Sequence, residues 1–359
     1  MRIVSPLLKH VVYPSLAKPG LLRRAAGRGL AVVTYHGVLP EGYEPVDPAL
    51  DGNLITAEML RRQLRLLKAR YHVIAPDDLL LWCRSGREFP PLSVLLTCDD
   101  GLRNNLTDML PVLQEEEVCC LFFVTGASAA DEPASLWYEE LFLILLAARS
   151  GHFETSDAGV EVNGELSRLE GRRAVWWNTV KLLSQVDAER RRAFLFAARI
   201  QLGVSDGMNS GGDDLPRQRR FRLLRREELL QLDAVGMTIG AHTLTHPMLS
   251  QSPPELALRE IAESRSRLEV ALGKPVWAFA YPFGGSDSIT PQVLAMAQQA
   301  GYEAAFLNIA GGLGTDIPRF AIPRVHVTAA MNLGEFEAHV AGVHGSLRRW
   351  AKRDLRAAV

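Results

Sequence analysis

Short runs of uncharged, mostly aliphatic residues recur along the chain. Residues 30–35 and 93–98 read Leu-Ala-Val-Val-Thr-Tyr and Ser-Val-Leu-Leu-Thr-Cys. A strand without charges is typical of one buried on both faces, as in a parallel sheet or barrel. Similar runs predict strands at 118–125, 237–241, 276–280, 304–307 and 320–327.

The segments between these runs predict helices. In 56–70, Met59, Leu60, Leu64 and Leu67 recur at helical spacing, and Thr56 is a typical helix start. Further helices are expected at 76–82, 106–117, 226–235, 254–272, 291–301 and 331–340. Strand, helix and strand at this spacing favour parallel pairing, and a chain of 359 residues is long enough for one α/β barrel with insertions.

Residues 127–225 interrupt this alternation. Residues 135–149 and 172–199 predict helices, whereas 205–214 is rich in Gly, Ser and Asp and predicts a mobile loop. We therefore expect a helical insertion on one side of the barrel. Trp137, Trp176 and Trp177 are interpreted as core residues of this insertion, with sugar-stacking platforms as the alternative.

Composition narrows the class of protein further. The net charge of −1 gives no electrostatic footprint for nucleic acid. Cys83, Cys98, Cys119 and Cys120 lack zinc-finger spacing and are interpreted as small core residues in a reducing compartment.

The two ends of the chain are basic. Residues 1–29 contain neither a secretory hydrophobic region nor a membrane span, so a cytoplasmic location is expected. The tail that follows the helix expected at 331–340 reads as a short basic amphipathic segment, for which contact with an anionic inner membrane surface is the alternative to a solvated helix; its basic residues are Arg348, Arg349, Lys352, Arg353 and Arg356.

Two adjacent carboxylates end the strand at 93–98. Asp99 and Asp100 can share one site only where the strand gives way to a turn, and Gly101 permits that turn. Buried carboxylates need a cation or hydrogen bonds to compensate their desolvation. This favours a functional role for Asp99 and Asp100, and the alternative is that they only cap a turn. His36 follows the strand at 30–35 in the same way and is a weaker candidate.

A pair of histidines follows the strand at 237–241. His242 and His246 are four residues apart, so a single helical turn would place both on one side, able to hold one metal ion. Pro247 keeps that turn short. The alternative to a metal site is that these are two unrelated loop histidines. Together with the Asp100 carboxylate, however, they form a set of two His and one carboxylate, which leaves coordination positions of the metal open for water and substrate.

Three ordered motifs carry a resemblance. Thr97-Cys98-Asp99-Asp100-Gly101, then His242 to His246, then Phe279-Ala280-Tyr281-Pro282-Phe283-Gly284 resemble the polysaccharide deacetylase family, carbohydrate esterase family 4, or NodB-homology domain. The resemblance implies a distorted (β/α) barrel of about seven strands at 30–330, with the insertion at about 127–225. An extension at 1–29 and a helix with a basic tail at 331–359 would flank it.

The resemblance also implies roles. Asp100, His242 and His246 would bind a divalent metal, most often zinc in this family, and Asp99 would be the base that activates a metal-bound water. His326 would be the general acid. A backbone N–H near Tyr281, in the Tyr281-Pro282 motif, would stabilise the oxyanion, and His36 would lie with these residues at the substrate.

The chain departs from the family pattern at two positions. Cys98 replaces a usual Phe, which we expect to affect packing more than chemistry. Ala280 stands where many members carry an Arg that orients the base. From their positions around the last predicted strand, Arg324 or Arg319 is the proposed replacement.

The expected function is metal-dependent removal of N-acetyl groups from an amino sugar in a glycan or lipid-linked saccharide. Two alternatives stay open: a non-catalytic glycan-binding module on the same fold, and a metal-dependent amidase or esterase acting on a non-sugar substrate. Nucleic acid is not expected as a partner, and the basic termini would suit a substrate at the membrane.

Overall fold

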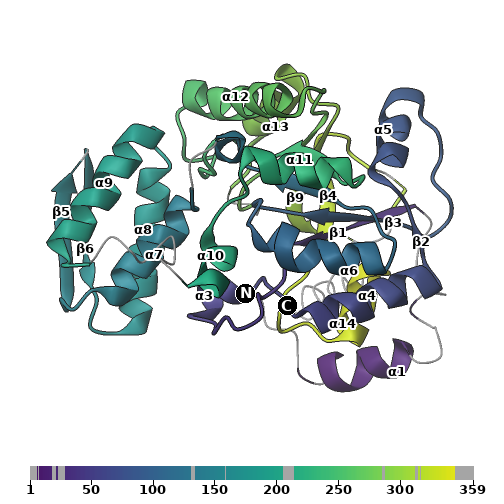
Figure 1. The fold of residues 1–359 in the computed structure, drawn as a ribbon, viewed down its shortest axis with the longest axis horizontal. Coiled ribbons are helices and arrows are strands. Elements are labelled where there is room, and N and C mark those ends of the chain that lie inside the picture. The colour runs from purple at the N-terminus through teal and green to yellow at the C-terminus, as the bar shows by residue number, and fades with distance from the viewer. Residues whose placement is uncertain are drawn as a thin grey trace, which may run out of the picture.

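The computed structural model describes residues 6, 8–17, 22, 29–130, 134–157, 159–204, 214–284, 288–311, 314–315 and 317–343. Within these residues, seven parallel strands close into a barrel (Figure 1). Their order is β1 (Leu30–Tyr35), β10 (Ile322–His326), β9 (Ala304–Ala310), β8 (Ala278–Ala280), β7 (Thr238–Ala241), β4 (Leu121–Val124) and β3 (Ser93–Cys98). Pairing of β3 with β1 closes the ring, and the short β2 (His72–Val73) adds to the start of β3. The predicted barrel of about seven strands is confirmed.

The register of the strands brings their carboxyl ends to one rim. Tyr35 pairs with Cys98, Thr34 with His326, and Val124 with Ala241. The residues that follow β1, β3 and β7, together with the end of β10, therefore meet at the same end of the barrel. This is the end at which parallel barrels carry their functional groups.

Helices cover the outside of the barrel. They are α4 (Ala57–Arg70), α5 (Pro76–Ser85), α6 (Leu110–Glu115), α11 (Arg226–Ala234), α12 (Pro254–Leu272), α13 (Pro291–Gln299) and α14 (Leu333–Val340). In α4, the Thr56 hydroxyl accepts from Met59 N at 3.1 Å, and Leu60, Leu64 and Leu67 are buried against the barrel. Between β1 and α4, the short α3 (Pro48–Asp51) lies at the rim. The helix expected at 106–117 begins as a π-helical turn, η2 (Asn105–Met109), just before Pro111, which has no N–H to donate.

The region at 127–225 forms a separate lobe beside the barrel, at the left of Figure 1. After η3 (Gly126–Ala129) it contains α7 (Trp137–Ala147), α8 (Leu169–Leu183), α9 (Ala188–Gln201) and α10 (Leu215–Phe221). It also contains an antiparallel hairpin, β5 (His152–Asp157) and β6 (Val160–Glu165), so it is not wholly helical as predicted. Phe153, Val160 and Val162 of the hairpin are buried in a core that the lobe builds with its helices.

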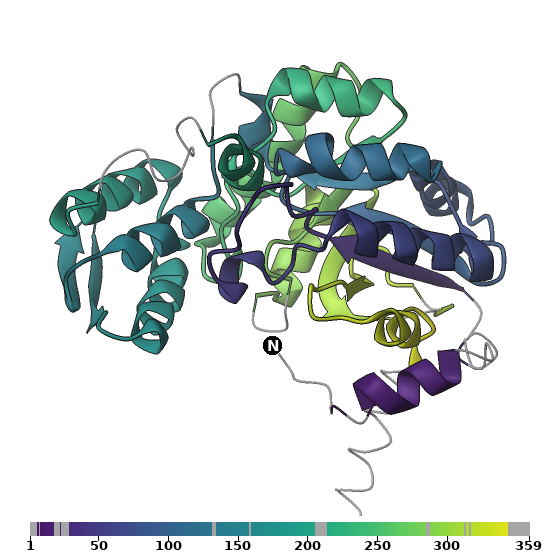
Figure 2. The same cartoon turned by 60° about the horizontal axis from the view of Figure 1, so that its bottom comes forward.

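The described N-terminal segment packs beneath the barrel. Helix α1 (Tyr13–Ala17), which follows η1 (Leu8–Val12), lies against α14 through Tyr13, Ala338 and Ala341 (Figure 2). The basic tail at 344–359 and most of the loop at 205–214 lie outside the described residues, so the membrane contact stays a prediction. Among the helices of the described residues, none has the length and apolarity needed to span a bilayer.

Candidate metal centre and active site

Asp99 and Asp100 lie at the point where β3 ends and turns. Asp99 N still donates to Tyr35 O at 2.9 Å, whereas Asp100 and Gly101 have φ angles of 77° and 72°. A Cβ on Gly101 would lie 2.9 Å from Val124 Cβ in addition to the unfavourable φ, so glycine is required there. The turn brings both carboxylates to the rim, where each is almost fully buried.

The histidine segment adopts a different backbone from the predicted helical turn. Thr243 and His246 have φ angles of 62° and 61°, in the left-handed region, so the segment is a tight bend. Its shape is fixed by local bonds: His242 N donates to Val124 O at 2.8 Å, and His246 N donates to Thr243 Oγ1 at 2.9 Å. The helical-turn prediction was wrong because these bonds, and Pro247 after His246, favour the bend.

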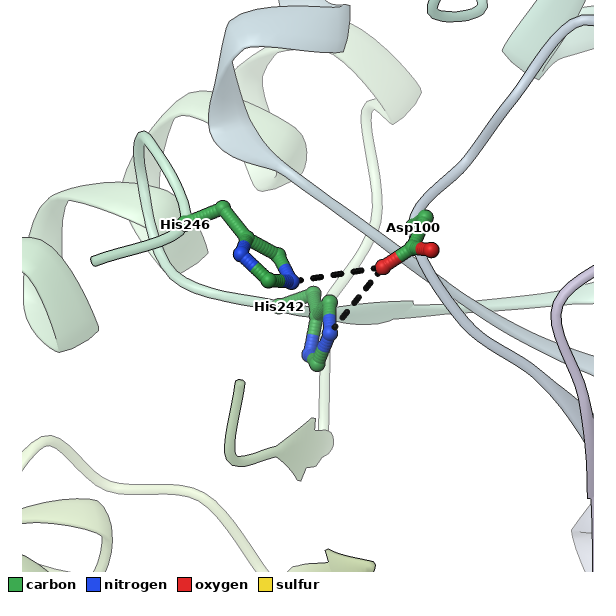
Figure 3. Close-up of side chains that lie close together, drawn as sticks. All are labelled: Asp100, His242 and His246. Atoms are coloured by element: carbon green, nitrogen blue, oxygen red, sulfur yellow. Dashed lines mark ion pairs between the residues drawn. The ribbon is translucent and has the colours of Figure 1, made fainter. Parts of the chain in front are cut away.

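The bend nevertheless brings both imidazoles to Asp100 (Figure 3). His242 Nε2 lies 3.6 Å and His246 Nε2 3.3 Å from Asp100 Oδ1, and one ligand atom from each residue lies within 4.8 Å of the others. His242 Nδ1 is 2.7 Å from Ala280 O. Because a carbonyl can only accept, Nδ1 carries the proton and Nε2 keeps its lone pair for a metal.

The protonation states of this triad also fit a metal. Burial opposes ionisation of Asp100, but the neighbouring side chains of His242 and His246 outweigh it and hold the pKa of Asp100 well below its ordinary value. Burial lowers the pKa of His246. An ionised carboxylate and neutral imidazoles are the forms that bind divalent metals, so the triad can hold such an ion with positions left open.

Asp99 is paired with a buried arginine from β10. Arg324 Nη1 and Nη2 each donate to one oxygen of Asp99 at 2.6 Å, and Arg324 Nε donates to Leu307 O at 3.0 Å. Burial would raise the pKa of Asp99, but Arg324 and then His242 outweigh it and lower that pKa. Of the two expected arginines, Arg324 is therefore the one that pairs with the Asp99 carboxylate, whereas Arg319 contacts Glu303.

His36 and His326 lie opposite this pair. Their ring centroids are 4.8 Å apart, and both side chains line the same cavity as Asp99. His326 Nε2 is buried without a hydrogen-bond partner among the described residues. Burial, and then the neighbouring His36, lower the pKa of His326 to about 3, so His326 is neutral near pH 7.

A backbone donor was expected near Tyr281, and the N–H of Tyr281 itself is already bonded within the barrel. Tyr281 N donates to Phe306 O at 3.0 Å, and the Tyr281 hydroxyl lies on main-chain carbonyls, so neither is available to a substrate. Pro282 has no N–H. The N–H of Phe283, whose φ is 59°, donates to no acceptor among the described residues, and Phe283 lines the cavity. Phe283 therefore replaces Tyr281 as the candidate oxyanion donor.

A cavity of about 460 Å³ joins these groups. The wall of the cavity beside the metal site is aromatic. The ring centroids of Phe283 and His246 are 5.0 Å apart, and those of Trp177 and Phe283 are 5.8 Å apart. Tyr138, 4.9 Å from His246, and Trp176 extend this wall. Three of the four rings come from the inserted lobe, and the sequence analysis had not predicted Tyr138 or Phe283 as part of the site.

A buried ion-pair cluster closes the cavity at the junction of the lobe and the barrel. Arg220 of α10 donates to Asp51 of α3 at 2.7 Å and to Glu139 of α7 at 2.8 Å. Burial raises the pKa of Glu139 to about 7, although Arg220 opposes the shift. The cluster had no sequence motif, because its members lie far apart along the chain.

Comparisons with known proteins agree with this site. The sequence profile of the polysaccharide deacetylase family matches residues 171–305. YxkH of Bacillus subtilis (strain 168), provisionally named as a polysaccharide deacetylase, is 25% identical over 117 residues, which cover 33% of this chain and 41% of YxkH. The match thus spans about two fifths of that relative.

Solved structures share the fold. The structure of IcaB from Ammonifex degensii is similar with a TM-score of 0.54 at 17% identity, over 88% of this chain and 98% of IcaB. The Streptococcus pyogenes deacetylase PplD, solved in complex with acetate, has a TM-score of 0.53 at 14% identity, over 86% and 96% of the two chains. The comparisons thus show a similarity to the polysaccharide deacetylase family over residues 171–305 and a shared fold with these deacetylase structures.

The Asp99–Arg324 pair gives a first prediction. Arg324→Ala leaves a buried carboxylate unpaired, so we expect it to destabilise the fold by about 3–5 kcal/mol and to lower turnover roughly 10- to 100-fold. Because the guanidinium keeps the pKa of Asp99 low, its loss should raise that pKa and move the acid limb of the kcat/KM pH profile to higher pH.

Arg324→Lys is the matched control, since it restores the charge but cannot bond both oxygens, and it should recover only part of the turnover. Denaturant unfolding and pH–rate profiles measure these effects. A folded Arg324→Ala variant with unchanged turnover and an unchanged acid limb would show that Arg324 does not serve the base.

Proposed function

We propose that this chain is a metal-dependent hydrolase that removes N-acetyl groups from an amino sugar in a glycan or lipid-linked saccharide. The observation that carries the proposal is the meeting of a candidate metal triad and a separately ionised carboxylate in one cavity. Asp100, His242 and His246 face one another, and the Asp99 carboxylate beside them is held by Arg324. The match of the polysaccharide deacetylase profile to residues 171–305 supports the same reaction class.

The chain's own residues divide the work of hydrolysis. A divalent ion held by the triad would polarise the acyl carbonyl and lower the pKa of a nearby water. Asp99 is held ionised by Arg324 and can accept a proton from that water, since each of its oxygens keeps a lone pair beyond its bond to the guanidinium. The Phe283 N–H is the candidate donor to the oxygen of the tetrahedral species, because Phe283 lines the cavity.

The leaving nitrogen needs a proton, for which His326 is the candidate donor. With a pKa of about 3, His326 is neutral in the free protein and must first take up a proton before it can donate one. His326 and Asp99 line the same cavity, and the protonated His326 would be favoured by the negative charge of Asp99. The geometry thus supports transfer of the proton across the cavity from the base side to the leaving-group side.

The aromatic wall supports a saccharide as the substrate. Trp177 is 38% exposed, although it is a large apolar side chain and lines the cavity. Amphipathic sugar rings present flat faces of C–H groups that can pack on such rings, while their hydroxyls bond to polar neighbours such as Asn308. A small non-sugar amide would leave this wall without a contact.

Acetate release from N-acetylated sugars tests the proposal. Protein stripped of metal and refilled with zinc should release acetate from at least one member of a panel of N-acetylated oligosaccharides and lipid-linked sugars, and the stripped protein should not. Asp99→Asn should lower the rate by about 10²–10⁴-fold while it retains zinc, because it removes the base and leaves the triad in place. Asp77→Asn, on the exposed start of α5, is the control.

The outcomes separate the alternatives. Release from simple non-sugar amides or esters in preference to every sugar would favour the amidase or esterase alternative. Tight zinc and glycan binding without release of acetate would favour a binding module. Full activity of Asp99→Asn would contradict the role of the base.

The aromatic wall gives a separate prediction. Trp177→Ala should raise KM for an oligosaccharide substrate by about tenfold, with a smaller change in kcat, because it removes a contact with the substrate away from the reacting bond. Trp177→Phe should have a smaller effect. Phe196→Ala removes another exposed aromatic ring of the same lobe, one that does not line the cavity, and it should leave KM unchanged. Equal KM values for Trp177→Ala and the wild type would exclude stacking on this ring.

A further inference from the structure

The loop that carries the two candidate histidine ligands, His242 and His246, is hydrogen-bonded to the inserted lobe. Trp137 Nε1 of α7 donates to the carbonyl oxygen of His246 at 3.2 Å. The Ser184 hydroxyl, at the end of α8, accepts from Met248 N at 3.0 Å, and Ser184 O accepts from the Ser252 hydroxyl at 2.7 Å. The lobe thus bonds to the main chain on either side of Pro247.

Thr245, which lies between the two histidines in sequence, is bonded to the buried ion pair of Glu260 and Arg191. Thr245 N donates to Glu260 Oε2 at 2.8 Å, and the Thr245 hydroxyl donates to the other oxygen of the same carboxylate. Glu260 belongs to α12, and its own carbonyl accepts from Leu244 N at 2.9 Å. Both its main chain and its side chain therefore support the bend.

The counter-charge of Glu260 comes from the lobe. Arg191 Nη2, on α9, lies 3.3 Å from Glu260 Oε1 and also donates to the Thr245 hydroxyl. Arg191 and Glu260 are each only 2% exposed. The guanidinium lies 5.3 Å from the centroid of the Trp137 ring, whose indole N–H bonds to His246. One buried cation therefore contacts both groups that hold the bend.

The bend needs this support because its backbone is strained. Thr243 and His246 adopt positive φ angles that cost a β-branched residue and an aromatic one of order 1 kcal/mol or more each. Such conformations persist only where the surroundings fix them. The direction of both imidazoles depends on the same backbone angles.

We propose that Arg191 and Glu260 are positioning residues for the metal-binding histidines, and that the inserted lobe is thereby an integral part of the metal site. Neither residue touches the triad. Glu260 orders Thr245, Arg191 holds that carboxylate in place, and the bend then directs the Nε2 atoms of His242 and His246 to Asp100. The inference rests on the metal site of the proposed function.

Cobalt titration followed by visible absorption tests the inference without any substrate. The full chain, stripped of metal, is titrated with Co²⁺ as the wild type, Arg191→Met and Arg191→Lys. We expect Arg191→Met to weaken cobalt binding by about 10–100-fold and to change the intensity of the ligand-field bands, as loss of outer-shell partners does. Arg191→Lys should restore part of both, since it returns the charge to Glu260.

A matched control separates positioning from general destabilisation. Arg70→Met breaks an ion pair with the fully buried Glu337 at 2.5 Å, away from the cavity, and should lower stability but leave cobalt affinity and spectrum unchanged. If Arg191→Met does not fold, Thr245→Val removes the hydroxyl that both charged groups contact and should alter the spectrum in the same direction.

Wild-type cobalt affinity and spectrum in a folded Arg191→Met variant, or in Thr245→Val where Arg191→Met does not fold, would overturn the inference and leave the proposed function standing. A wild-type chain that binds no cobalt would overturn the metal site itself, and the inference with it. These two failures are distinguished by the first titration.

Discussion

Burial of two adjacent carboxylates at one rim of the barrel is the constraint on which the site depends. Removing an ionised carboxylate from water costs several kcal/mol unless a partner compensates it. The protein meets this cost in two different ways. Arg324 pairs with both oxygens of Asp99, whereas Asp100 faces the two imidazoles of His242 and His246. Two neighbours of the same type therefore acquire different chemistry.

The two environments explain the separation of roles. Asp99 is held by a permanently charged group that leaves it ionised and fixed, which suits a base. Asp100 faces the Nε2 atoms of His242 and His246, and the three ligand atoms lie close enough together for a divalent cation to join them. The strand register produces this division, because β10 brings Arg324 to one side of the β3 terminus and β7 brings the histidines to the other.

The inserted lobe supplies parts of the cavity that the barrel alone does not provide. It supplies three of the four rings of the aromatic wall and the main-chain contacts of the histidine bend. The Arg220 cluster joins the lobe to the α3 segment at the mouth of the cavity. The lobe has its own hydrophobic core, which fixes α7, α8 and α9 relative to one another and so positions the side chains that contact the barrel.

Local patterns predicted the elements whose burial is set by their own sequence. The uncharged runs became β1 and β3, and the spacing of Leu60, Leu64 and Leu67 became the buried face of α4. The hairpin β5–β6 was missed, although Val160 and Val162 alternate with exposed residues, because six-residue strands between helices give a weak signal. The bend at His246 contacts Glu260 of a distant helix, and the N–H of Tyr281 is bonded to Phe306 O of β9; neither contact can be read from local sequence.

Anomalous diffraction from crystals grown with zinc tests the central claim most directly, because it locates the ion independently of any substrate. The account predicts one strong peak at the zinc absorption edge, about 2.0–2.2 Å from an oxygen of Asp100 and from Nε2 of His242 and of His246, with Asp99 still on Arg324. A zinc peak at another group of residues, or none at this triad in crystals soaked with the metal, would contradict it.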